Sequence, residues 1–199
     1  MMDQIEDIFK SVVEEVGKSV IITKTSPGGS TDEAKGVDIN YIFGSAQYIK
    51  DMLDVRSKGV GSNMPLKFPL IALQTPNVQT VDSGDYQYRT KINLIIACSS
   101  KKEWSNEKRM ETSFKRILLP IYEKLIEVLL RDRRFEWNYG GLEYVPHTMS
   151  KNFDYGRYGA MTPSGQEVSE PIDAIDVRSL EIKVNNQNCV RVYVKNQNL

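Results

Sequence analysis

The chain has 199 residues and carries 26 Lys and Arg against 26 Asp and Glu, so its formal net charge at neutral pH is zero. This length suits one domain with a substantial hydrophobic core. The balanced charge argues against a general nucleic-acid-binding protein, which usually presents a basic face, and no apolar run is long enough to span a bilayer.

The N-terminal residues and the cysteines indicate no secretion and no metal site. Residues 1–10 are acidic and amphipathic, without the basic start and apolar centre of a signal peptide. Cys98 and Cys189 lie in strand-like segments and in no metal-type spacing. Two buried, reduced thiols are the simplest interpretation. We expect no metal and no cofactor, and a protein that is made and first used in a cytoplasm.

The first predicted element is an amphipathic helix that ends at Gly17, a residue type that commonly follows a helix. Its apolar face consists of Ile5, Ile8, Phe9, Val12, Val13 and Val16. A short strand over 20–23 follows, and then a loop over about 24–36. Gly28 and Gly29 in this loop are not followed by the Gly-Lys-Ser or Gly-Lys-Thr of a phosphate loop, so we do not expect nucleotide binding.

The next segments are a strand, a short helix and a second strand. Residues 37–43 alternate in polarity, and the expected buried face consists of Val37, Ile39, Tyr41 and Phe43. Ser45 is placed to cap a short helix. In the strand over 66–73, Pro69 cannot donate a ladder hydrogen bond, so it belongs on an edge strand, at a bulge or near a strand start. An edge would let another subunit dock, and a bulge inside one monomer fits equally well. A loop is expected over about 74–85.

The clearest pattern is the alternation from Tyr86 to Cys98, which predicts a long strand with one buried face. A long helix follows from about Ser105 and should cover that face. Its apolar stripe consists of Met110, Phe114, Ile117, Leu118, Ile121, Tyr122, Leu125 and Leu129. Pro120 removes a backbone donor, which predicts a kink at about 116–119 or two helices that meet there.

Aromatic residues and glycines are interleaved in a loop expected over about 149–171. Phe153, Tyr155, Arg157 and Tyr158 form a residue mix that is typical of protein interfaces. Base stacking is the alternative, which the zero net charge disfavours. His147 has no Cys or carboxylate near it in sequence, so a structural role is favoured.

The last predicted element is a hairpin with strands over 172–184 and 189–194. Asp173 and Asp176 could form a carboxylate pair, but no base, nucleophile or metal ligand accompanies them in sequence. The whole chain, 1–199, is therefore predicted to be a single α+β domain. It has an antiparallel or mixed sheet with helices packed on one face, a long kinked helix after the central strand and a C-terminal β-hairpin. The sequence contains no phosphate loop, dinucleotide fingerprint, His-Glu-x-x-His or Gly-x-Ser-x-Gly motif.

Several of these segments resemble small virion proteins of tailed bacteriophages. The resemblance is carried by the runs 39–44, 47–49, 67–73, 92–97, 106–109, 114–122 and 173–177, together with Leu180. These runs are similar to the tail-terminator or neck (head–tail joining) ring family. The resemblance covers roughly Val37 to Val184 and rests on hydrophobic and turn residues, not on an active site. The glycine-rich loop over 26–36 and the C-terminal hairpin are less typical of the family.

The resemblance implies a non-enzymatic structural protein, located in the virion neck or tail after assembly in the host bacterial cytoplasm. Such proteins form six- or twelvefold homo-oligomeric rings that contact portal, connector or tail-tube proteins, with DNA passing through the lumen without specific binding. No membrane is involved. The candidate contact residues are Phe68, Pro69, Val78, Val81, Phe153, Tyr155, Arg157 and Tyr158. Two alternatives remain: a monomeric adaptor, and a metal-dependent nucleic-acid-processing enzyme that uses Asp173, Asp176 and His147.

Overall fold

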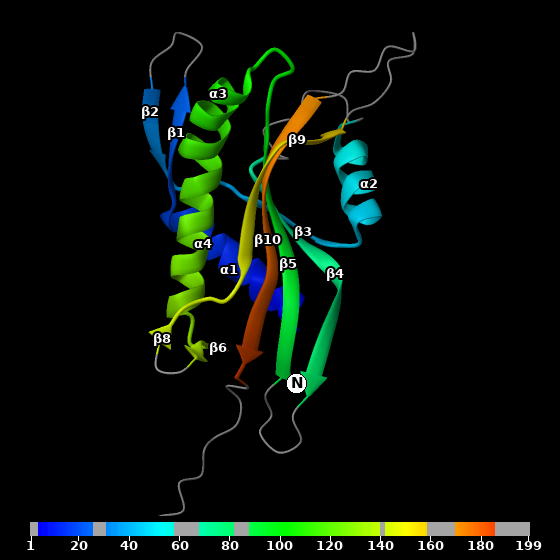
Figure 1. Cartoon of the computed structure of the whole chain (residues 1–199), viewed down its shortest axis with the longest axis vertical. Coiled ribbons are helices and arrows are strands. Elements are labelled where there is room, and N and C mark those ends of the chain that lie inside the picture. Colours follow the sequence, from blue (N-terminus) through cyan, green and yellow to red (C-terminus); the bar gives the residue numbers. More distant parts are fainter. Residues whose placement is uncertain are drawn as a thin grey trace, which may run out of the picture.

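A six-stranded mixed sheet forms the centre of the molecule (Figure 1). The structure is a computed structural model, and it describes residues 4–25, 31–57, 68–81, 88–139, 142–158 and 170–185. The strand order is β3–β4–β5–β10–β6, and β9 also pairs with β10. The strands are β3 (Asn40–Gly44), β4 (Leu70–Val81), β5 (Tyr88–Ser99), β6 (Phe135–Glu136), β9 (Thr148–Tyr158) and β10 (Glu170–Val184). β3 runs parallel to β4, and the other pairs are antiparallel.

Helices and two small hairpins surround this sheet. The helices are α1 (Ile5–Ser19), α2 (Ala46–Ser57), α3 (Asn106–Arg109), the π-helix η2 (Met110–Leu118) and α4 (Leu119–Arg131). The hairpins pair β1 (Ile21–Thr25) with β2 (Thr31–Lys35) and β7 (Asn138–Tyr139) with β8 (Leu142–Glu143). None of the helices in the described part of the chain is long and apolar enough to cross a membrane.

The main core lies between one face of the sheet and the helices α1, η2 and α4 (Figure 1). Alternation explains how the sheet supplies its half of this core: Ile92, Leu94 and Ile96 of β5 point to the same side and are buried there. The stripe of η2 and α4 supplies Phe114, Leu118, Ile121, Leu125 and Leu129. The predicted packing of the long helix on the central strand is therefore confirmed.

A smaller core lies on the opposite face of the sheet, under α2. Ile49 and Leu53 of α2 pack there against apolar residues of β3, β4, β5 and β10. These are Ile42, Leu70, Ala72, Ile95, Ala97, Ile172 and Ala174. The α+β class with a mixed sheet is confirmed, and the main helical layer covers one face as predicted, but α2 covers part of the other face. Ile42 is buried because of α2, whereas Phe43, expected on the buried face, is 49% exposed.

Three segments that were expected to be loops contain strands. β2 lies within 24–36, β4 extends through the first part of 74–85, and β9 occupies most of the first half of 149–171. These strands are largely exposed and pair through their backbones, so their side chains lack the alternation that marks a half-buried strand. The first strand of the predicted C-terminal hairpin is β10, and residues 189–194 lie outside the described part of the chain.

Gly17 lies within α1, so the expectation that it ends the helix is wrong. The helix continues to Ser19, and the segment before β3 passes directly over Gly17. The Val37 N–H donates to the Gly17 carbonyl at 2.8 Å, and a Cβ on Gly17 would lie 2.7 Å from the Val37 carbonyl oxygen. Gly17 is thus required for close backbone approach.

The disruption predicted near Pro120 takes the form of a change in helical hydrogen bonding. The π-helix η2 ends at Leu118, and the Leu119 N–H donates to the Phe114 carbonyl, five residues earlier. Pro120 follows at the start of α4, where a missing backbone donor costs least. The two helical types therefore meet within the predicted interval 116–119.

Candidate functional site: the sheet edges and the groove beside β3

One sheet edge is the outer half of β4, which projects beyond β3. β3 pairs only with Leu70–Gln74, and after a register shift the segment Val78–Val81 pairs with β5 alone. Val78 and Val81 are 73% and 63% exposed. These two predicted contact residues therefore lie on a strand, where they present apolar side chains beside a backbone edge that pairs with no other described strand.

Phe68 and Pro69 lie at the start of β4, away from this edge. The Pro69 carbonyl accepts a hydrogen bond from the Asn40 N–H at 2.9 Å, and Phe68 packs against the smaller core. β4 has neighbours on both sides from Leu70 to Gln74, directly after Pro69, so the strand-start alternative for Pro69 applies and the edge alternative is wrong. A contact role for this pair stays a prediction.

The opposite sheet edge is formed mainly by β9, which pairs with β10 on one side. Tyr155 and Met149 are exposed on it. Phe153 instead packs toward the main core, with its ring centroid 4.6 Å from that of Phe114. Partial burial raises the pKa of Tyr155, and the Asp176 carboxylate beside it adds to the rise. Arg157 and Tyr158 belong to β9, but their side chains lie outside the described part of the structure.

Asp173 forms a buried ion pair that joins the start of the long helix to the sheet. Its Oδ1 lies 2.9 Å from Arg109 Nη1 and accepts the Asp154 N–H at 3.1 Å. Arg109 also donates to the carbonyls of Trp104 and Lys101, at 3.3 and 3.2 Å. The Asp173 side chain is fully buried and that of Arg109 is 7% exposed. Such an arrangement fixes the relative position of three elements, because each of its charges is costly to leave unpaired.

Cys98 lies buried near this ion pair. The pKa of its thiol is raised to about 12, mainly by burial; a hydrogen bond with Ser113 opposes the rise, and the Asp173 charge adds a smaller increase. A thiol that stays protonated is a poor nucleophile. Cys98 therefore fits the predicted role of an inert core residue.

The three residues of the enzyme alternative are not brought together. Asp173 and Asp176 point to opposite faces of β10, since the pairing of β10 with β5 is regular between them. Asp176 pairs with Arg178 at 2.8 Å. His147 Nδ1 donates to the Val145 carbonyl at 2.7 Å, so its Nε2 accepts the Tyr122 hydroxyl at 2.8 Å. Among the described residues, no cluster of three or more His, Cys, Asp or Glu could hold a metal ion.

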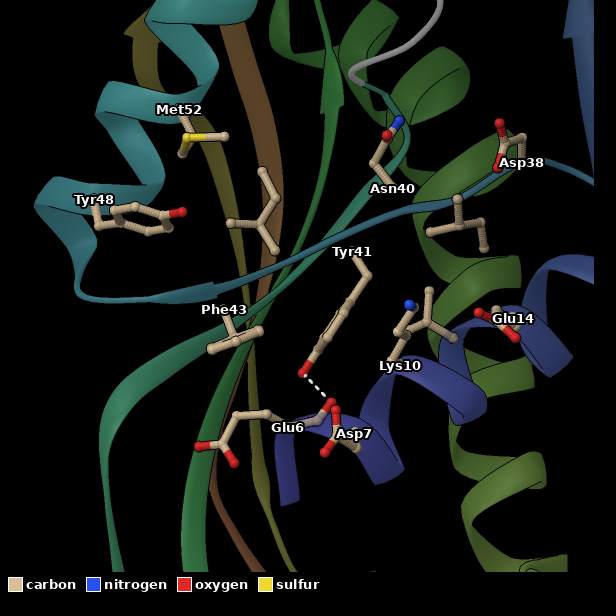
Figure 2. Close-up of a pocket in the computed structure, with 13 residues that line it drawn as sticks. Glu6, Asp7, Lys10, Glu14, Asp38, Asn40, Tyr41, Phe43, Tyr48 and Met52 are labelled. Atoms are coloured by element: carbon tan, nitrogen blue, oxygen red, sulfur yellow. Dashed lines mark hydrogen bonds between the residues drawn. The ribbon is translucent and has the colours of Figure 1, made fainter. Parts of the chain in front are cut away.

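An open groove of about 510 Å³ runs along the outer edge of β3 (Figure 2). Glu6, Asp7, Lys10 and Glu14 of α1 line one side of it, and Asp38 lies at one end. Tyr48 and Met52 of α2 lie on the other side of β3. The groove thus has an acidic wall and a more apolar wall, with a strand edge between them.

Tyr41 ties β3 to the acidic wall of the groove. Its hydroxyl donates to the Glu6 carbonyl at 3.0 Å (Figure 2). Burial raises the pKa of Tyr41 well above its usual range, and the carboxylates of Glu6 and Asp7 add to the rise. The hydroxyl therefore stays protonated and keeps its hydrogen bond. On the β4 side, Asn77 Nδ2 donates to Glu6 Oε1 at 3.2 Å, which fixes the Glu6 side chain.

The sequence did not reveal this groove. α1, β3 and α2 were each predicted, but their meeting depends on contacts between residues far apart in the chain. One signal was present: Ile42 is apolar on the supposedly polar side of its strand, which indicates a strand covered on both faces.

Comparisons with known proteins give no family for this chain: no protein-family model matches it, and no curated protein matches it.

Proposed function

We propose that the protein is a non-enzymatic structural subunit of a tailed-bacteriophage virion, which assembles into a ring at the head–tail junction or at the end of the tail. The proposal rests on the resemblance to the tail-terminator and neck-ring family and on the arrangement of the sheet edges. The observation that carries it is the pair of strand edges on opposite sides of one sheet.

A ring requires two different patches on each subunit, because every copy contacts its two neighbours in a head-to-tail manner. The β3–β4 side of the sheet offers Phe43, Val78 and Val81 as exposed apolar side chains. The β9 side offers Met149 and Tyr155. Exposed strand edges bearing apolar side chains tend to pair with another chain. These two surfaces are therefore the candidate contacts with neighbouring subunits or with portal, connector and tail-tube proteins.

The direct test is the composition and symmetry of assembled particles. Mass spectrometry of purified virions should detect this chain, and a reconstruction of the neck or tail end should place its copies around the tail axis in six- or twelvefold symmetry. Absence of the chain from assembled particles would contradict the proposal.

The outer half of β4 can be tested separately. Val78→Lys together with Val81→Lys should weaken self-association or incorporation into particles at least about tenfold, because two charges would have to be buried. Ile21→Lys is the control for a charge added at an exposed apolar strand position, since Ile21 is 50% exposed on β1, which belongs to a separate two-stranded sheet. Light scattering after size-exclusion chromatography at increasing concentration, and incorporation into particles, are the measurements. Equal effects of the two changes would argue against a contact at β4.

A further inference from the structure

The outer edge of β3, which faces the groove, pairs with no strand in the described part of the chain. The Asn40 N–H donates to Pro69, so the backbone groups of Asn40 point toward β4. In a strand this direction alternates, and the N–H and C=O groups of Tyr41 and Phe43 therefore point to the open side. No described strand pairs with β3 on that side. The edge is a template for one more strand.

The two walls of the groove define which strand would fit. Successive side chains of an added strand would point alternately toward α1 and toward α2. The α1 side has Glu6, Asp7 and Glu14 against a single cation, Lys10. The α2 side has Tyr48 and Met52, and Tyr48 is 50% exposed. The complementary strand alternates basic or polar residues with apolar residues.

The chain contains such a sequence in its C-terminal segment. Residues 189–195 read Cys-Val-Arg-Val-Tyr-Val-Lys. Val190, Val192 and Val194 would share one face, and Arg191, Tyr193 and Lys195 the other. We propose that residues 189–195 of one copy add as a strand to the β3 edge of a neighbouring copy, with the valines toward α2 and the basic residues toward α1. This deepens the proposed function and rests on it, since it supplies a contact between successive subunits.

The distance between β10 and the open edge of β3 indicates that the added strand comes from a neighbouring copy and not from the same chain. Four residues separate Cys189 from Asn185, the last described residue, and a chain of that length spans at most about 14 Å. The open side of β3 is four strand positions from β10, or about 19 Å at the usual strand spacing. The end of β10 and the end of β3 are also offset along the strand direction. Val184 lies level with Tyr88 of β5, whereas Gly44 lies level with Asn93, five residues or about 17 Å away. The combined distance of about 25 Å exceeds the reach of the chain's own segment.

The test is the binding of a labelled peptide of residues 186–199, with Cys189→Ser to prevent oxidation. The receptor is the full-length chain carrying Val190→Asp, Val192→Asp and Val194→Asp, so that its own segment does not compete. Fluorescence anisotropy should show saturable binding of this peptide and none of a scrambled peptide of the same composition. Glu14→Lys with Asp38→Lys in the receptor should weaken binding at least about tenfold, because the acidic wall loses its charge complementarity.

Glu15→Lys with Glu33→Lys is the matched control, with the same change in net charge at exposed positions that do not line the groove. It should change the affinity less than about twofold. Thermal melting of each variant checks that it is folded. Equal binding of the native and scrambled peptides, equal loss in the groove and control variants, or no binding to the folded receptor would overturn the inference. None of these results decides whether the chain is present in virions, so failure of the strand contact and failure of the proposed function are distinguishable.

Discussion

At the scale of single residues, the Arg109–Asp173 pair places two opposite charges where almost no solvent reaches them. Asp173 accepts from the Arg109 guanidinium and from the Asp154 N–H, which is presented by a residue in the left-handed region at φ 54°. Non-glycine residues adopt that conformation infrequently, so the bulge of β9 at Asp154 has a local cost. The hydrogen bond to Asp173 offsets part of this cost and fixes β9 against β10.

Asp173→Asn should lower the free energy of unfolding by about 3–5 kcal/mol, because it leaves the buried Arg109 cation unpaired. Arg109→Met should have an effect of similar size, and the double variant should cost much less than the sum of the two. Urea unfolding followed by circular dichroism measures all three. Glu111→Gln is the control, since its ion pair with Lys115 is exposed to solvent and should contribute almost nothing. Additive losses in the double variant would show that the two residues act independently.

At the scale of elements, the junction between α1 and the segment before β3 depends on Gly17. Gly17→Ala should destabilise the protein by about 1–3 kcal/mol, because the new Cβ meets the Val37 carbonyl, a backbone atom that cannot rotate away. The better helix propensity of Ala, about 1 kcal/mol, offsets only part of this loss. Gly156→Ala on β9 is the comparison, since a Cβ there meets no atom within 4 Å. A thermal melt of both variants tests the difference, and an unchanged melting temperature for Gly17→Ala would contradict the close approach.

The elements also show which parts of the fold were predictable. β5 and the long helix were predicted because their apolar residues recur with the period of the surface they bury, as in Ile92, Leu94 and Ile96. β9 and the outer half of β4 were expected to be loops, since their side chains are mostly exposed and only backbone pairing makes them strands. Pro76 and Asn77 sit in the register shift of β4 and further obscured its continuation. The same exposure that hid these strands makes them candidate contacts.

The candidate contact residues differ in exposure, which the sequence pattern of an expected loop does not reveal. Val78 and Val81 are predicted contact residues in an expected loop, and they lie exposed on a sheet edge. Phe153 is also a predicted contact residue in an expected loop, but its ring packs on the main core. Aromatic composition alone does not tell a buried ring from an exposed one. The groove beside β3 was missed because it depends on where α1 and α2 lie relative to one strand edge, and that is set by long-range packing.

At the scale of the whole molecule, zero net charge suits the proposed ring, through which DNA would slide without being held, because each basic contact strengthens binding to phosphate. The part of the second sheet face that α2 does not cover carries Lys91 and Lys183, and each is paired with a carboxylate: Lys91 with Glu181 at 3.7 Å and Lys183 with Glu136 at 3.0 Å. The carboxylates beside these lysines offset part of their attraction for phosphate. These two lysines therefore contribute little to DNA binding.

We therefore expect the dissociation constant for duplex DNA to be weaker than about 1 µM at physiological salt. Glu181→Gln with Glu136→Gln should tighten DNA binding, because two lysines lose their paired carboxylates. The slope of the logarithm of the association constant against the logarithm of the salt concentration should become more negative by about 0.9 for each additional phosphate contact. Fluorescence anisotropy with a labelled duplex at several salt concentrations measures both quantities. Glu33→Gln with Glu15→Gln, at exposed positions away from this face, controls for the change in net charge. Submicromolar binding by the unaltered chain would contradict passage without specific binding, and it would favour a protein that acts on nucleic acid over one that encloses it.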